Sequence, residues 1–300
     1  MPLLVVGSIG IDTILTETGK AENVLGGSAS YAAVSAAFFG RVNLVGIVGD
    51  DFPEEHLRLF RSRRVNLEGL ETVRGGRTFR WTGRYHPDFV KRDTVEIHLN
   101  VFESFRPAIP PACRAAPFVL LSNIDPELQL SVLDQTERPG FVAADTMNLW
   151  LDIKRPQVEE LLSRVDLIVM NDEEAQQYAG EKNLISAGRK LLRPGAKWAV
   201  IKKGAHGALL FSRSGVVPMP AFPVERVVDP TGAGDCFIGG LMGYLSRAGK
   251  TGPGALKRAV AFGTVMASFD VEAYSLDRLK NLDKKQVMGR YARFRTMLAF

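Results

Sequence analysis

The stretch that decides the fold is Val227-Val228-Asp229-Pro230-Thr231-Gly232-Ala233-Gly234-Asp235-Cys236-Phe237. An apolar segment ends at a proline, and a Gly-Ala-Gly turn then leads into a long helical pattern. Small residues let a ligand approach the backbone, and the first N–H groups of a helix have no acceptor within it. The sequence therefore predicts an anion site at Gly232, Ala233 and Gly234, suited to phosphate or to the charge that develops during phosphoryl transfer.

Asp235 lies in the first turn of that predicted helix. One interpretation is structural, because a carboxylate near a helix N-terminus is stabilised by the helix dipole. Next to a bound phosphate, however, a second negative charge is repulsive unless it acts on the attacking hydroxyl group. We therefore predict that Asp235 is a general base that accepts the proton of a substrate alcohol.

A second segment, Val200-Ile201-Lys202-Lys203-Gly204-Ala205-His206-Gly207-Ala208-Leu209-Leu210, reads as strand, tight turn and strand. It fits an ordinary hairpin in which the two glycines adopt positive φ. It also fits a nucleotide site, in which Lys202 or Lys203 beside an open glycine loop holds the outer phosphates. The residues alone leave both interpretations open.

Two further segments combine a structural and a functional interpretation. In Asn171-Asp172-Glu173-Glu174, Asn171 is a good helix N-cap. Asn171 and Glu174 are also three residues apart on one face, at the end of a predicted strand, where they could organise a hydrated Mg²⁺. In Leu25-Gly26-Gly27-Ser28, the glycines permit close helix packing or contact with a polyol ligand.

Short apolar runs alternate with helical patterns along most of the chain, which predicts a doubly wound α/β fold with a mainly parallel sheet in three layers. The expected buried strands are Leu3–Val6, Val42–Val48, Phe118–Leu121, Phe141–Ala144, Leu167–Met170 and Trp198–Ile201. The expected helices are Ser28–Phe39, Glu54–Arg63, Pro156–Arg164, Glu173–Ala179, Gly232–Arg247, Pro253–Phe269 and Lys284–Leu298. Four polar residues near strand ends could reach a cleft or merely cap turns, namely Asn123, Asp125, Asp145 and Asn148.

Two segments break this alternation. Gly75–Phe102 is rich in Thr, Arg, aromatic and β-branched residues, and Ile11–Thr18 is a short segment in which polar and apolar residues alternate. We expect them to form exposed antiparallel strands of a small β-sheet lid over one edge of a single domain, residues 1–300. The lid carries Arg77, Arg80, Trp81, Arg84, Tyr85 and His86, which suits either an acidic or aromatic ligand or the protection of exposed strand edges.

The bulk composition excludes several classes of protein. The net charge of +5 is modest for 300 residues and shows no dense basic stripe, so we expect no nucleic-acid partner. No apolar run approaches the roughly 20 residues that span a bilayer. Two cysteines and no evident export signal favour a cytoplasmic protein.

The four segments, in this order, resemble the ribokinase or PfkB-type carbohydrate kinase family. That family has an early Gly-Gly segment, Asn-x-x-Glu, a Gly-x-x-Gly loop and an Asp-Thr-x-Gly-Ala-Gly-Asp signature, which appears here as Asp229–Asp235 with Pro230 inserted. The resemblance extends from Val5 to about Leu276. It implies a ribokinase-like fold, ATP and Mg²⁺ as ligands, and a lid that often mediates homodimers.

The resemblance also implies roles for individual residues. Asp235 is the implied base, and the amides of Gly232, Ala233 and Gly234 the implied anion hole. Contacts to ATP would come from Lys202, Gly204, Gly207 and Thr231, and Asn171 and Glu174 would act on Mg²⁺ through water. Substrate contacts are expected from Asp12, Gly26, Gly27, Tyr31, which stands where ribose-binding members have Asn, and Arg84. The stretch Ala267–Ser275 leaves a monovalent cation requirement open.

The function expected is therefore ATP-dependent phosphorylation of a hydroxymethyl group on a sugar or sugar derivative. A nucleoside kinase of the same fold is the alternative. Two remoter alternatives are an NAD(P)-binding oxidoreductase, suggested by Val5-Val6-Gly7-Ser8-Ile9-Gly10, and an inactive sugar-binding regulator.

Overall fold

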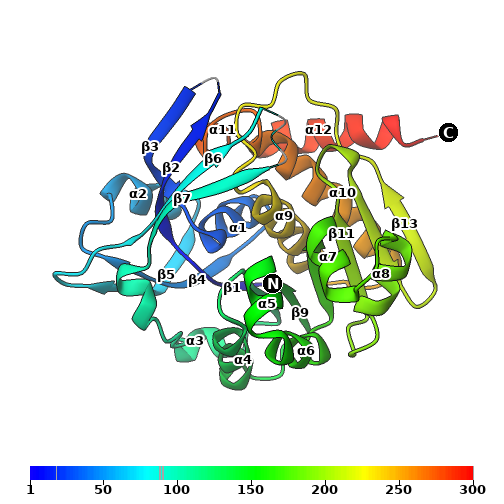
Figure 1. Cartoon of the computed structure of the whole chain (residues 1–300), viewed down its shortest axis with the longest axis horizontal. Helices are drawn as coiled ribbons and strands as arrows, with labels where there is room; N and C mark the ends of the chain where they lie inside the picture. The colour runs from blue at the N-terminus through cyan, green and yellow to red at the C-terminus, as the bar shows by residue number, and fades with distance from the viewer. Residues whose placement is uncertain (18, 88, 90, 300) are drawn as a thin grey trace.

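The computed structural model of the chain describes residues 1–17, 19–87, 89 and 91–299. Within this part, one large sheet runs through the molecule and a smaller sheet projects from it (Figure 1). The predicted lid ranges include Thr18, Asp88 and Val90, which lie outside the described residues.

The large sheet has nine strands in the order β13-β12-β11-β10-β9-β8-β1-β4-β5. Neighbours from β11 to β5 are parallel, and β12 is antiparallel to both β11 and β13. The strands are β1 (Leu3–Val6), β4 (Val42–Gly49), β5 (Val65–Val73), β8 (Phe118–Leu121), β9 (Phe141–Asp145), β10 (Leu167–Asn171), β11 (Trp198–Lys202), β12 (Ala208–Ser212) and β13 (Gly215–Met219).

Helices cover both faces of this sheet, because alternate strand residues point to opposite sides and both sides are apolar. Leu3 and Val5 pack with α1 (Ser28–Ala37), α2 (Glu54–Ser62), α9 (Ala233–Ala248), α10 (Pro253–Asp270), α11 (Asp277–Lys280) and α12 (Lys284–Met297). Leu4 and Val6 pack with α3 (Pro111–Arg114), α4 (Pro126–Gln135), α5 (Asn148–Ile153), α6 (Arg155–Arg164), α7 (Asp172–Ala179) and α8 (Leu184–Leu191). The predicted three-layer, mainly parallel α/β fold is confirmed.

The small sheet has the order β3-β2-β6-β7, formed by β2 (Gly10–Thr16), β3 (Gly19–Gly26), β6 (Phe79–Tyr85) and β7 (Arg92–His98). A 3₁₀ turn, η1 (Asn100–Ser104), follows it. The predicted small lid sheet is confirmed, but two details were wrong. Its central pair, β2 and β6, is parallel, and β2 is largely buried. This strand lies inside the sheet and contributes Ile11 and Ile14 to the buried interior.

Helices α1 and α9 lie against each other at very short range. A Cβ added at Gly243 would lie 2.8 Å from both Cα and the carbonyl oxygen of Ala36, and one added at Gly239 would overlap the Ala32 backbone. Ser35 Oγ also donates to the Cys236 carbonyl at 2.6 Å. Small residues therefore let these two backbones touch, and both helices begin at segments that the sequence predicts to bind ligands.

Candidate active site

Helix α9 begins with Gly232 as N-cap, in the left-handed region at φ 80°, and no side chain caps this end. Asp229 holds the preceding loop, because its two carboxylate oxygens accept the N–H groups of Thr231 (2.8 Å) and Ser275 (2.9 Å). The sequence predicts that the Ala233 amide is free, but this amide donates to the Pro230 carbonyl at 3.2 Å. In the described chain, the amides of Gly232 and Gly234 have no acceptor and are left for an anion.

Four charged side chains lie near this helix end, those of Lys202, Asp145, Glu174 and Asp235. Lys202 is the last residue of β11, with its side chain 18% exposed, and its Nζ lies 3.9 Å from Asp145 Oδ2. A Cβ added at Gly234 would lie 2.7 Å from the same Nζ. The strands explain the meeting: β10 and β11 place Asn171 beside Lys202, and β9 and β10 place Asp145 beside Val169, all at the carboxyl edge of the sheet.

Burial raises the pKa of Asp235 to about 7. The nearby carboxylate of Asp145 also raises it, while the cations of Lys202 and Arg92 oppose the shift. A carboxylate with a pKa near neutrality is matched to general-base work at physiological pH. The lysine responds in the reverse sense: burial lowers the pKa of Lys202, but Asp145, Glu174 and Asp235 raise it overall, so it stays charged.

Asn171 and Glu174 form a capping box at the start of α7. Glu174 Oε2 accepts the Asn171 N–H at 2.8 Å, and Asn171 Oδ1 accepts the Glu174 N–H at 2.7 Å. Burial raises the pKa of Glu174 to about 7, with Lys202 opposing and Asp145 adding to the shift. The predicted N-cap is confirmed, and the same pair lies within electrostatic reach of the site.

This donor set can be tested against Mg²⁺. The described residues contain no group of three or more His, Cys, Asp or Glu able to hold a metal ion. Mg²⁺ on a nucleotide usually keeps several waters and is bound by phosphates plus one or two carboxylates. The carboxylates of Glu174 and Asp145 beside Lys202 fit such a hydrated ion.

The acceptor end of the site contains an unpaired carboxylate. Asp12 on β2 is 4% exposed, and its Oδ1 has no hydrogen-bond partner in the described chain. Burial, together with the charges of Asp229 and Asp235, raises its pKa to about 8. A Cβ at Gly26 would overlap the Asp12 carboxyl group, and Gly27 at φ 89° presses on the Ser8 backbone. A buried acceptor without a donor is rare in proteins, so this carboxyl is suited to hydroxyl groups of a ligand.

The Gly204–Gly207 segment is a turn with a 3₁₀ helix, η2 (Gly204–His206), closed by the Lys203 N–H donating to the Gly207 carbonyl at 2.7 Å. The hairpin predicted between β11 and β12 is confirmed. Gly207 is required by packing, because a Cβ there would overlap the Met219 carbonyl oxygen, whereas space around Gly204 is open. Of the two lysines considered, Lys202 reaches the acidic cluster.

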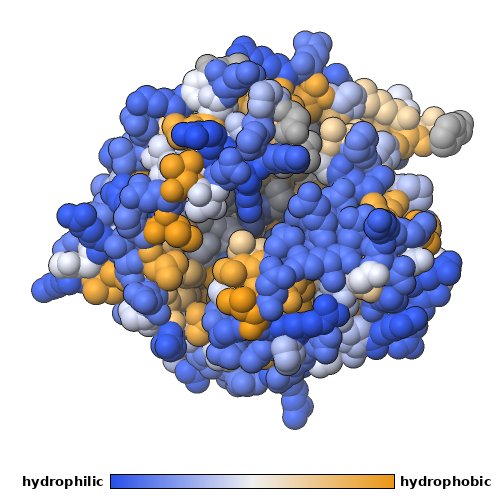
Figure 2. Space-filling view, viewed as in Figure 1, coloured by the Kyte–Doolittle hydropathy of each residue, from blue (hydrophilic) through white to orange (hydrophobic). Residues whose placement is uncertain are grey.

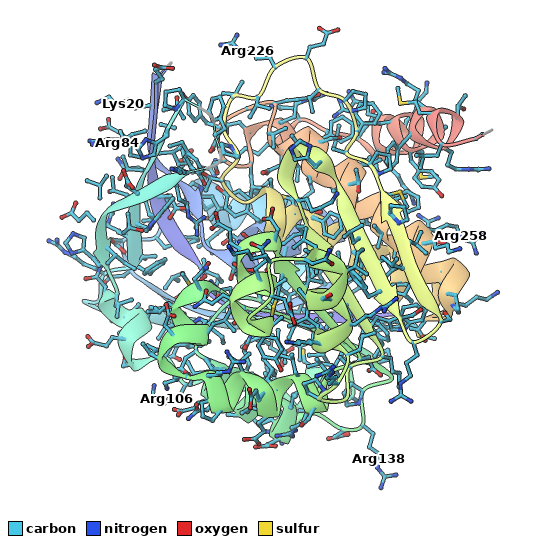
Figure 3. The ribbon with its side chains drawn as sticks, turned by 45° about the vertical axis from the view of Figure 1, so that its right-hand side comes forward. Lys20, Arg84, Arg106, Arg138, Arg226 and Arg258 are labelled. Carbon is cyan, nitrogen blue, oxygen red and sulfur yellow. The ribbon has the colours of Figure 1, made fainter. Side chains whose placement is uncertain are left out.

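The two remaining predicted substrate contacts, Tyr31 and Arg84, lie on α1 and β6. Tyr31 is 1% exposed, and its ring fills the space against Gly232, so it supports the loop from beneath. The sequence missed this because Tyr31 lies in the buried face of α1. Arg84 is exposed on β6 and extends outward at the lid rim with Lys20 (Figure 3). The strand-end residues divide: Asp145 enters the cluster, whereas Asp125 caps α4 and pairs with Lys154 at 2.7 Å.

The sequence analysis also missed Arg92, at the start of β7. Arg92 opposes Tyr85 across the β6–β7 pair, and its Cζ lies 5.7 Å from the centroid of the Trp81 ring. It lowers the pKa of Asp12, Glu174 and Asp235, so all three carboxyl groups sense its charge. Its position follows from the register of β7 against β6, and the sequence predicted strands within Gly75–Phe102 without giving the bounds of each strand.

A nine-stranded α/β sheet, a helix N-terminus with two free amides, a carboxyl group with a pKa near 7 and a β lid together define a ribokinase-like phosphotransferase. The chain belongs to the pfkB family of carbohydrate kinases, whose family model matches residues 2–278. It is therefore a kinase, and the resemblance stated from its motifs is confirmed. The oxidoreductase alternative is wrong: strand β2, not a helix, follows the Gly7–Gly10 turn.

Similar proteins include nucleoside and sugar kinases. A cytidine kinase of Thermococcus kodakarensis is 34% identical over 82% of this chain and 89% of its own length. A nucleoside kinase of Methanothermobacter thermautotrophicus is 27% identical, over 90% of this chain and 89% of its own. Among solved structures, a ribokinase of Arabidopsis thaliana complexed with ribose and ATP has a TM-score of 0.79 at 22% identity, covering 97% of this chain and 98% of that one.

Proposed function

We propose that this enzyme transfers the γ-phosphoryl group of ATP to a hydroxymethyl group of a nucleoside or related sugar derivative. The observation that carries the proposal is the arrangement of Asp235, Lys202 and the free amides of Gly232 and Gly234 around one point. Asp235 takes the proton of the acceptor hydroxyl, whose oxygen attacks the γ-phosphorus. The bond from that phosphorus to the β–γ bridging oxygen breaks, and ADP leaves with the electron pair.

Charge that develops on the transferred group is stabilised by the amides of Gly232 and Gly234 and by the Lys202 ammonium. Mg²⁺, when bound with ATP, neutralises phosphate charge and orients the outer phosphates. Glu174 and Asn171 would hold it through water. Asp12 would position the acceptor by accepting hydrogen bonds from its remaining hydroxyl groups, next to the backbone of Gly26 and Gly27. Both oxygens of Asp229 already accept backbone amides, and we assign no step to a monovalent cation.

A row of polar contacts that begins at Ser28, directly after Gly27, favours a nucleoside over a simple sugar as acceptor. Ser28 Oγ lies 3.1 Å from Ser8 Oγ and donates to the Asn123 carbonyl at 3.1 Å. Asn123 Oδ1 accepts the Trp150 indole N–H at 3.0 Å, and Asn123 Nδ2 donates to the weak acceptor Met147 Sδ at 3.2 Å. A partly exposed amide and indole beyond the hydroxyl-binding end suit a planar base, which a free sugar lacks.

Apolar surface surrounds this row on two sides. Leu149 (45% exposed) and Ile153 (62%) lie on α5, and a patch of apolar surface covers that helix in Figure 2. A second apolar patch follows β7, which carries Val95 and Ile97. The 34% identical relative is a cytidine kinase, which agrees with a nucleoside acceptor.

The test is a panel of nucleosides, ribose and fructose with Mg²⁺ and ATP, scored by ADP release and by mass of the product. We expect the highest kcat/KM for a nucleoside, with the phosphate on its hydroxymethyl carbon. Turnover of sugars alone would favour the sugar-kinase alternative. Binding of sugars or nucleosides without ADP release would favour the inactive regulator.

We also propose a homodimer formed through the lid. The outer strand β7 is exposed along its whole length, and Val95 and Ile97 are 50% and 53% exposed. An unpaired edge with apolar side chains is a template for a second strand, and a second copy of the chain would cover it. No helix in the described chain is long and apolar enough to cross a membrane.

A further inference from the structure

The charge at the reacting centre is unbalanced without the lid. Asp235 raises the pKa of Asp12, and Asp145 and Glu174 raise that of Asp235. Lys202 is a largely buried cation whose pKa Asp145, Glu174 and Asp235 raise. Transfer brings a further negatively charged group into this region. Attraction strong enough to hold that group therefore calls for additional positive charge close to Asp235.

Arg92 is placed to supply it. Asp12 lies opposite Trp81 in the parallel β2–β6 pair, and the guanidinium of Arg92 lies over that tryptophan, 5.7 Å from its centroid. On the other side, Arg92 opposes Tyr85 in the β6–β7 pair. Burial raises the pKa of Tyr85, and the nearby Arg92 and Thr231, the latter at the anion loop, oppose this rise. The guanidinium thus lies between the acceptor-binding strand and the start of α9.

The guanidinium is also available to a ligand. Arg92 is exposed, and none of its nitrogen atoms is within 4.0 Å of a carboxylate oxygen in the described chain. Its charge lowers the pKa of Asp12, Glu174 and Asp235 without a direct ion pair to any of them. Two other lid arginines differ: Arg80 pairs with Asp51 at 3.3 Å, and Arg84 extends outward from the lid (Figure 3).

We propose that Arg92 is a catalytic residue that the lid places on the transferred phosphoryl group. This inference rests on the proposed kinase activity and adds a residue to it. A planar guanidinium can bind two phosphoryl oxygens at once, which an ammonium cannot. Because Arg92 comes from β7 and Lys202 from β11, the full set of cations exists only while the lid lies over the site. Water can attack the γ-phosphorus of ATP while the lid is open and no acceptor is bound. That hydrolysis would proceed without the Arg92 cation.

The experiment compares Arg92→Gln and Arg92→Lys with Lys20→Gln, a lid variant with the same loss of charge. Lys20 lies on the outer strand β3 and pairs with the exposed Glu22 at 3.1 Å. With the preferred nucleoside, Arg92→Gln should lower kcat by about 10²-fold or more, with KM for ATP changed by less than about threefold. Arg92→Lys should recover only a small part, and Lys20→Gln should match the wild type.

Two further measurements separate this role from a structural one. Removing the cation should move the acidic limb of the kcat/KM profile to higher pH, because Arg92 lowers the pKa of Asp235. Binding of ADP with aluminium fluoride, measured by calorimetry, needs no identified acceptor and should weaken by at least about tenfold in Arg92→Gln. A kcat within threefold of wild type, or unchanged affinity for ADP with aluminium fluoride, would overturn the assignment. Wild-type protein without phosphoryl transfer to any acceptor would instead refute the proposed function, whereas the calorimetric result still decides the role of Arg92.

Discussion

Lys202 and Asp145 lie at the ends of two strands that are not adjacent, with 3.9 Å between Nζ and Oδ2. The same ammonium lies so close to Gly234 that a Cβ added there would be 2.7 Å from Nζ. The strand between them, β10, ends at Asn171, the cap of α7. Three strand ends and one helix end therefore converge on a single centre of charge. The reactivity of Asp235 depends on this convergence, and each contributor can be changed separately.

Asp235→Asn should lower kcat by roughly 10²-fold or more, because an amide cannot accept the acceptor's proton. The affinity for ATP should remain, since the amides and Lys202 are unchanged. Steady-state kinetics and calorimetry with ATP measure the two effects. Asp277→Asn, at an exposed first-turn position of α11, is the matched control. Activity within a few-fold of wild type would support the interpretation of Asp235 as a helix-dipole residue only.

Gly234→Val should abolish transfer without unfolding the core. Even a Cβ at this position would lie 2.7 Å from Lys202 Nζ, so a branched side chain must displace the ammonium and cover the free amide. Gly254→Ala, at an open position in α10, is the control and should leave kinetics unchanged. Circular dichroism confirms folding, and unaltered kinetics in Gly234→Val would contradict the anion-site assignment.

The pH dependence of kcat/KM should show an acidic limb near pH 7. Asp235 acts deprotonated, and burial raises its pKa to about 7, so activity rises as the pH increases through that value. Asp145 contributes to this raised pKa, so Asp145→Asn should move the limb to lower pH, opposite in direction to Arg92→Gln. Profiles of the three proteins at saturating ATP measure the shifts, and identical limbs would argue against Asp235 as the titrating base.

Asp12→Asn should stabilise the free protein while impairing catalysis. Burial raises the pKa of Asp12 to about 8 from its ordinary value of 3.8. Between these values the unfolded chain releases the proton and the folded one retains it, so the free energy of unfolding falls as pH rises. The variant should gain melting temperature at pH 8 and little at pH 4, which a thermal scan at both pH values measures. An equal gain at both pH values would point to a cause other than ionisation.

Glu174→Gln should raise the Mg²⁺ concentration required for half-maximal rate. Glutamine at this position can still complete the capping box with Asn171, so α7 should keep its start. Only the negative charge near the nucleotide phosphates is lost. Titration of Mg²⁺ at fixed ATP measures the change, and Glu173→Gln, an exposed first-turn neighbour, is the control. An unchanged Mg²⁺ requirement would leave Glu174 with the capping role alone.

Much of the fold was predictable because buried parallel strands are short, apolar and bounded by turns, as in Leu3–Val6 and Phe118–Leu121. The sequence does not reveal β5, with its mixed pattern in Val65–Val73, as a sheet edge, nor β3 as a lid strand. Asp235 and Asn171 were identifiable because their local motifs carry the signal. Arg92 and Tyr31 were not, because a β-sheet register and a helix face decide where those side chains point.

The contact between α1 and α9 sets the distance between the acceptor site and the phosphate site. One helix starts directly after Gly27, where the acceptor would lie, and the other starts at the phosphate end. The spacing of the two reactants is thus set by how closely Gly239 and Gly243 in α9 approach Ala32 and Ala36 in α1, well inside both helices. A single methyl group added at Gly239 or Gly243 would push the two helices apart and increase the distance between the attacking oxygen and the γ-phosphorus. These glycines therefore control that distance although they lie far from both reactants.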